Sequence, residues 1–162
     1  MFIYSIRAST IKFLAVIVIC IVGLVGMIAL SGNSAAYASA DGVEINYGGI
    51  KTEEDRLAYI KGFGLSVDGE SVTSETVSFP DEFDIALNTY NEIQKAQGLD
   101  LTKYRNKRVT HYTYTVTNYE NEGTVYVNLY VYRNKIIGAD LSSADPTGFV
   151  VALTQIDETK LK

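Results

Sequence analysis

Tyrosine is the residue type of this chain best suited to binding: the sequence holds 12. Tyr126, Tyr130 and Tyr132 share one face of a predicted strand, because side chains alternate along a strand, and Tyr112 and Tyr114 share a face of the preceding strand. If even positions lie opposite even positions, the five rings form one aromatic patch suited to sugars or peptides. The alternatives are that a helix covers this face, or that tyrosine simply suits strands.

His111 is the one histidine of the chain and the first candidate for catalysis. A serine–histidine–aspartate set is formally available with residues from a later strand and loop, namely Ser142 or Ser143 with Asp140 or Asp145. However, the sequence contains no G-x-S-x-G turn that would expose the nucleophile. We therefore expect His111 to be an ordinary strand residue, and we predict no catalytic residue and no enzymatic activity.

Acidic residues gather at two places where a helix is predicted to begin: Glu53, Glu54 and Asp55, and then Asp81, Glu82 and Asp84. Paired carboxylates can cleave glycosidic bonds, so a cell-wall hydrolase is an alternative function. Acids in the first turn also stabilise a helix through its dipole, whatever the protein does. The second interpretation is favoured.

Metal sites find little support in the sequence. Cys20 and His111 are each single, which excludes zinc sites built from several cysteines and histidines. Residues 118–123 match the first half of a calcium-binding loop, with side-chain oxygens at positions 1, 3 and 5 and glycine at position 6. Position 12, where a bidentate glutamate belongs, is Leu129. We predict no metal and no cofactor.

Charge is unevenly distributed along the chain. Residues 1–40 contain no acid and two bases, whereas residues 41–162 hold all 19 acids and the other 12 of the 14 bases. A nucleic-acid binder needs a basic face that neutralises phosphates. The acidic balance therefore argues against nucleic acid as a partner.

An unbroken apolar run of 18 residues covers 13–30. As a helix it would be about 27 Å long, close to the hydrocarbon thickness of a membrane. Arg7 and Lys12 precede the run and acids follow it, so residues 1–12 are expected in the cytoplasm and the rest outside. The run is predicted to be a retained signal anchor and transmembrane helix. The alternative is a secreted protein, cleaved near Ala38 or Ala40 after a small-x-small pattern.

After a linker at 31–46, residues 47–162 are predicted to form an extracytoplasmic α+β domain of two or three helices packed on an antiparallel sheet. Thr52 and the acids after it resemble a capping box, and Gly62 or Gly64 would end that helix. Residues 65–79 suggest one or two strands with a turn at 68–69. A second helix opens at 80–82 and stops at Gly98, with one apolar stripe made of Phe83, Ala86, Leu87, Tyr90 and Ile93.

The C-terminal half reads as a three-stranded antiparallel meander over 107–118, 125–132 and 136–141. Val125, Val127, Leu129 and Val131 occupy the strand face opposite to Tyr126 and should be core. A short last helix, capped at 145–146, is expected to carry three apolar residues, Phe149, Val150 and Leu153.

Four stretches carry a resemblance over nearly the whole chain: MFIYSIRASTIKFLAV, NYGGIKTEEDRLAYIKGFG, YNEIQKAQGLDLTKY and TVTNYENEGTVYVNLYVYRNKIIGADLSSAD. They are similar to a family of small, uncharacterised membrane proteins of clostridia-type Gram-positive bacteria. Its members share one domain of unknown function behind an N-terminal membrane segment. The resemblance implies a location and an architecture, and it brings no catalytic residues.

Together these observations predict a single-pass membrane protein whose extracytoplasmic domain binds a ligand or a protein partner of the cell envelope without catalysing a reaction. The partner could also be a membrane protein, because Gly23 and Gly26 would allow close contact between helices.

Overall fold

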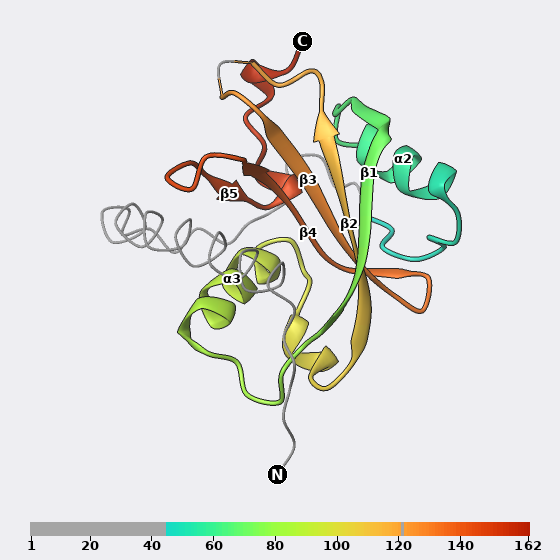
Figure 1. The fold of residues 1–162 in the computed structure, drawn as a ribbon, viewed down its shortest axis with the longest axis vertical. Helices are drawn as coiled ribbons and strands as arrows, with labels where there is room; N and C mark the ends of the chain where they lie inside the picture. The colour runs from blue at the N-terminus through green and yellow to red at the C-terminus, as the bar shows by residue number, and fades with distance from the viewer. Residues whose placement is uncertain (1–44, 121) are drawn as a thin grey trace.

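Five antiparallel strands follow one another across a single sheet in the order in which they occur along the chain (Figure 1). The computed structural model describes residues 45–120 and 122–162. The strands are β1 (Val67–Ser78), β2 (Arg108–Val116), β3 (Val125–Tyr132), β4 (Lys135–Ser143) and β5 (Val150–Val151). The predicted α+β class and the predicted C-terminal meander are confirmed.

The first described helix, α2 (Glu53–Lys61), begins as the sequence predicts. The hydroxyl of Thr52 accepts from the backbone N–H of Asp55, and the Asp55 carboxylate accepts from the N–H of Thr52 in return. This reciprocal pair is a capping box, which satisfies donors that the first helical turn leaves open. The helix ends at Gly62, and Gly64 then takes a positive φ of 75° that glycine adopts without strain.

The second described helix, α3 (Ile85–Lys95), starts later than the predicted opening at 80–82, because Asp84 is its N-cap and accepts from the N–H of Leu87 at 2.8 Å. Gly98, at a φ of 80°, lies just beyond its end, as predicted. All five residues of the predicted apolar stripe lie in or against one hydrophobic cluster: Phe83, Ala86, Leu87, Tyr90 and Ile93.

The two helices cover opposite faces of the sheet, which gives three layers (Figure 1). On one face α3 packs with Val109 and Tyr130. On the other, Ile60 of α2 shares a cluster with Val127 and Leu129, which are fully buried. Both faces of the central strands are therefore buried where the helices cover them, and neither face of β3 is fully exposed to solvent.

Side-chain amides complete the outer edge of β4, the edge away from β3, where β5 does not reach. β5 pairs with β4 only at Leu141 and Ser142. Next to that pair, the N–H of Ala139 donates to Oε1 of Gln94 at 2.8 Å, and its carbonyl accepts from Nε2 of Gln97 at 2.6 Å. The two glutamines come from α3 and the turn after it, so the helix is fixed to the sheet by side-chain hydrogen bonds to the main chain as well as by apolar contact.

Two details of the sequence reading are corrected. Residues 67–78 form one strand with a bulge between Asp68 and Thr73, in place of a turn that would separate two strands. The predicted last helix is wrong: Val150 belongs to β5, and Leu153 opens a single 3-10 turn, η2 (Leu153–Gln155). Asp145 caps a tight turn by accepting from the N–H of Thr147, and this turn returns the chain to β4.

Two further 3-10 turns complete the described elements: η1 (Leu101–Tyr104) follows α3, and η3 (Glu158–Lys160) precedes the last two residues. The predicted cytoplasmic segment 1–12 and membrane segment 13–30 lie outside the described residues, as does the linker up to residue 44. Among the residues that are described, no helix is long and apolar enough to cross a membrane.

Candidate functional site

The five tyrosines predicted to form one patch are divided between the two faces of the sheet. Tyr112 pairs with Leu129 and Tyr114 with Val127, so even positions of β2 lie opposite odd positions of β3. Since directly opposite residues point to the same face, Tyr112 and Tyr114 lie on the α2 face, and Tyr126 and Tyr130 lie on the α3 face. The condition for a single aromatic patch is therefore not met.

Most of these rings already have partners inside the domain. The guanidinium of Arg56 lies 3.9 Å from the ring centroid of Tyr112 and donates through Nε to the hydroxyl of Tyr114 at 2.7 Å. Tyr130 is buried, and Tyr132 meets the edge of Tyr104 with centroids 5.6 Å apart. These tyrosines therefore pack against other side chains of the domain.

Polar side chains form a hydrogen-bonded series across the α3 face of the sheet, which we call the polar chain. The hydroxyl of Tyr90 donates to Oδ2 of Asp140 at 2.7 Å, and Nδ2 of Asn128 donates to Oδ1 of Asp140 at 3.0 Å. Oδ1 of Asn128 lies 3.0 Å from Nε2 of His111, whose Nδ1 lies 3.4 Å from Glu75. All but Glu75 are buried.

The contacts of the polar chain favour one tautomer of His111. Because the amide group of Asn128 donates to Asp140 and Ser142, its Oδ1 is the atom that faces His111. The amide oxygen of Asn128 and the carboxylate of Glu75 both only accept, and the shorter contact, 3.0 Å at Nε2 against 3.4 Å at Nδ1, favours the proton of the neutral ring on Nε2. Nδ1, on the side of Glu75, is then the unprotonated nitrogen.

Burial perturbs both titratable groups inside the polar chain, in opposite senses. It raises the pKa of Asp140 to about 6, although hydrogen bonds from Tyr90 and Asn128 act against this. It lowers the pKa of His111, against the pull of Glu75 and Asn128. Desolvation disfavours the charged form of each group, which explains the two directions. Near neutral pH the histidine is therefore uncharged.

The formal serine–histidine–aspartate set is not assembled. The hydroxyl of Ser142 accepts from Asn128 at 2.9 Å, so Asn128 stands between the serine and His111. Ser143 is buried and accepts from the N–H of Asp145 at 3.1 Å. The polar chain therefore has the geometry of a structural network that satisfies buried polar groups.

The acids considered as an alternative pair of catalytic carboxylates lie at helix starts and in turns. Asp55 and Asp84 cap α2 and α3, and Asp81 accepts from the side chain of Asn106 at 2.8 Å. Backbone hydrogen bonds lower the pKa values of Glu54 and Asp55. The helix-start interpretation holds for the first group and for Asp84, whereas Asp81 and Glu82 lie before α3, whose first turn contains no acid. Within residues 45–120 and 122–162, no group of acids, histidines or cysteines is arranged to hold a metal ion.

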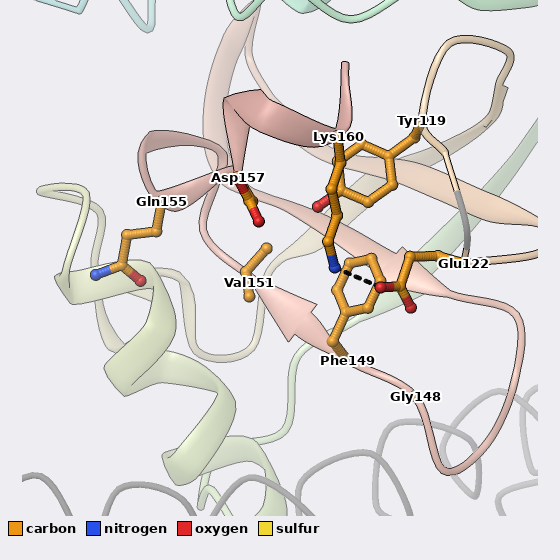
Figure 2. A pocket seen from close by; sticks show the side chains of 8 residues that line it. All are labelled: Tyr119, Glu122, Gly148, Phe149, Val151, Gln155, Asp157 and Lys160. Atoms are coloured by element: carbon orange, nitrogen blue, oxygen red, sulfur yellow. Dashed lines mark hydrogen bonds and ion pairs between the residues drawn. The ribbon is translucent and has the colours of Figure 1, made fainter. Parts of the chain in front are cut away.

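An open pocket lies between the β2–β3 connection, β5 and the C-terminal segment (Figure 2). Its volume is about 320 Å³. The rings of Tyr119 and Phe149, with centroids 5.8 Å apart, provide apolar surface together with Val151. Glu122, Asp157 and Lys160 supply the charged groups of its lining.

Backbone pairing holds the C-terminal side of this pocket against the β2–β3 connection. Tyr119 and Leu161 form an antiparallel bridge. Beside it, the N–H of Glu120 donates to the carbonyl of Lys160 at 2.9 Å, and the N–H of Lys162 donates to the carbonyl of Asn118 at 3.0 Å. The lining residues from the two segments are therefore positioned relative to each other by main-chain hydrogen bonds.

The charges of the pocket are arranged in pairs. Lys160 forms a short ion pair with Glu122 across the pocket, and this hydrogen bond raises the pKa of Lys160 (Figure 2). The side chain and N–H of Thr159 donate to Asp157 and lower the pKa of that carboxyl. Burial raises the pKa of Tyr119. The pocket thus combines aromatic surface with fixed charges of both signs.

Sequence analysis did not identify this pocket. Its aromatic and charged residues come from segments about thirty positions apart, 119–122 and 148–160, and neither segment contains a complete motif. Asn118, taken as position 1 of a calcium loop, uses its Oδ1 to accept from the N–H of Ser66 at 2.7 Å. The sequence contains no signal that joins Tyr119 to Phe149, because it predicts Tyr119 between two strands and Phe149 on the last helix.

Comparison with known proteins gives one match. The family described as "Domain of unknown function (DUF4830)" matches residues 59–141, just over half of the chain. No curated protein matches significantly, and no solved structure does so either. The matched range includes every member of the polar chain, whereas Phe149, Asp157 and Lys160 of the pocket lie beyond it.

Proposed function

The chain belongs to the DUF4830 family, a domain of unknown function, and from this starting point we propose that it is a single-pass membrane protein whose extracytoplasmic domain binds a ligand of the cell envelope. The proposed binding site is the pocket between Tyr119 and Phe149, and no reaction is catalysed there. We also propose that the protein is related to the small membrane proteins of clostridia-type Gram-positive bacteria that it resembles.

The pocket is the observation that carries the binding role. Two aromatic rings 5.8 Å apart lie beside Glu122, Asp157 and Lys160, in a cavity of about 320 Å³. Aromatic surface next to a few fixed polar groups is the usual composition of a small-ligand site. Sugars and peptides present the same combination of apolar faces and polar edges, which supports an envelope ligand.

The membrane location is supported by the sequence alone. The apolar run at 13–30 is long enough to span a bilayer, and the bases at Arg7 and Lys12 favour a cytoplasmic N-terminus. A protein cleaved near Ala38 or Ala40 and then secreted would present the same domain outside the cell. The location of the protein, in the membrane fraction or in the medium, and its mass separate these two versions.

The binding role is tested with the full chain, isotope-labelled and solubilised in detergent micelles, by titrating solubilised cell-wall fragments and following backbone amide signals by NMR. Saturable shifts clustered at Tyr119, Phe149 and Val151 are expected. The variant Phe149→Ala should lose them, whereas Ile85→Ala, which truncates an exposed side chain of α3, should retain them. Shifts elsewhere, or equal shifts in both variants, would move the site away from the pocket.

The orientation is tested by cysteine labelling on intact cells. In a Cys20→Ser background, a cysteine placed at the exposed Ser74 should react with a membrane-impermeant maleimide. A cysteine at Ser5 should react only after the cells are opened. The opposite pattern would place the domain in the cytoplasm.

A further inference from the structure

Lys160 gives the pocket an ammonium group of its own. Its side chain extends from η3 into the pocket and points toward Glu122 (Figure 2). Nζ forms the ion pair with Glu122 and lies 5.9 Å from the ring centroid of Tyr119. A cation next to both a carboxylate and an aromatic face is stabilised by the charge and by the ring quadrupole. The pocket therefore already holds a primary ammonium from the chain itself.

The remaining charges of the described lining favour a cation at this place. Lys160 is the only base among these lining residues, and Glu122 and Asp157 are acids. Asp157 lines the same pocket as Lys160, and its negative charge contributes, after Glu122, to the raised pKa of Lys160. If Lys160 swings out, two carboxylates and two aromatic rings remain around the vacated position. That set would attract a positively charged group and repel an anion.

Displacement of Lys160 requires little reorganisation. The side chains of Lys160 and Glu122 are 34% and 29% exposed, so solvent screens their attraction. Ion pairs of this exposure are weak, and a lysine side chain has enough rotatable bonds to leave the pocket without movement of the backbone. The main chain at Lys160 stays fixed by its hydrogen bond from Glu120. The side chain can thus move while the pocket keeps its shape.

We propose that the pocket binds a primary alkylammonium group, such as the side chain of a lysine in an envelope peptide, and that Lys160 occupies the ammonium position until this ligand displaces it. The proposal rests on the proposed binding function of the pocket and names its ligand class. The alkyl part of the ligand lies against Tyr119 and Phe149, and its ammonium takes the place of Nζ beside Glu122.

The test compares two probes that differ in charge and share an alkyl chain: Nα-acetyl-lysine N-methylamide and Nα-acetyl-norleucine N-methylamide. Binding to the full chain in detergent micelles is followed through the amide signals of Phe149 and Val151. The lysine probe should bind Lys160→Met about two- to fivefold more tightly than the wild type, the factor by which a partly exposed ion pair competes. The norleucine probe should bind both proteins more weakly than the lysine probe does.

Lys162→Met is the matched control. Lys162 is a neighbouring exposed lysine that pairs with Glu120 at 2.7 Å and does not line the pocket. This variant makes the same change of charge and should bind the lysine probe as the wild type does. Glu122→Gln should weaken the lysine probe and leave the norleucine probe unchanged, and unaltered amide signals of the sheet will show that each variant is folded.

Equal binding of the two probes, or no gain in Lys160→Met relative to Lys162→Met, would overturn the ammonium proposal. The proposed function would survive that result if cell-wall fragments still shift the pocket signals and Phe149→Ala abolishes those shifts. If neither fragments nor probes act on the pocket in any of these proteins, both proposals are wrong.

Discussion

The imidazole of His111 lies flat against the phenol ring of Tyr130, with centroids 4.4 Å apart and planes within 8° of parallel. The stack closes one side of the imidazole, while Asn128 and Glu75 meet its two nitrogens. A charged imidazolium would lose its hydration at this place, so burial keeps the ring neutral. Three of the predictions below concern this part of the core and the sheet around it.

The first prediction is that His111 titrates below its ordinary pKa of about 6.5, with the proton of the neutral ring on Nε2. The unfolded chain takes up a proton near pH 6.5 and the folded chain only at lower pH. Stability contributed by neutral His111 is therefore lost as pH falls through this window. Imidazole ¹⁵N and ¹³C shifts measured against pH report both the midpoint and the tautomer. A midpoint above 6.5, or a proton on Nδ1, would contradict the geometry of the polar chain.

The second prediction concerns Asp140, whose pKa burial raises to about 6. Between pH 4 and 6 the folded state holds a proton that the unfolded chain has released, so the free energy of unfolding contributed by this group decreases as pH rises. Asp140→Asn cannot titrate. Relative to this variant, the wild type should lose up to about 3 kcal/mol between pH 4 and 7. Denaturant unfolding at several pH values measures the difference, and a difference independent of pH would refute the buried acid.

The third prediction tests the amide contacts at the edge of β4. Gln94→Leu removes the acceptor for the N–H of Ala139 and for the side chain of Gln97. Because buried donors are then left unpaired, the variant should lose about 1–3 kcal/mol of stability. The Ala139 amide should also exchange faster with deuterium. Glu92→Leu, at an exposed position of the same helix, serves as control and should leave both quantities nearly unchanged.

The fourth prediction tests the core on the α2 face. Leu129 is fully buried between β2 and β4, and Leu129→Ala leaves a cavity. The expected loss is about 2–5 kcal/mol, the usual range for such truncations. Ile85→Ala removes a side chain that is 86% exposed and should change the free energy of unfolding by less than about 0.5 kcal/mol. Similar losses in both variants would contradict the assignment of the core.

Elements with strong local signals could be predicted from the sequence. Alternation of apolar and polar residues predicts β2, β3 and β4. The capping box predicts the start of α2, and the apolar stripe from Phe83 to Ile93 predicts α3. Each signal lies within a single element, where neighbouring side chains and the first helical turn decide the conformation.

Register and long-range contacts could not be predicted in this way. Whether Tyr112 meets Leu129 or Tyr130 depends on how the connection between β2 and β3 turns, and a slip of one residue exchanges the two faces. The pocket likewise depends on the bridge between Tyr119 and Leu161, which joins residues far apart in the chain. The segment predicted as the last helix contains the strand β5 instead, because the turn at Asp145 brings Val150 beside Ser142.

Because of the glutamine contacts at Ala139, the two edges of the sheet differ in whether another strand can pair with them. On the β4 side, glutamine amides and the two-residue β5 already use the main-chain groups. On the opposite side, Phe79 faces β2 through its hydrogen bonds with Asn106 and Lys107, so alternation directs the peptide groups of Ser74, Thr76 and Ser78 outward. Among the described strands, a strand from another chain would therefore pair with β1 and not with the β4 edge.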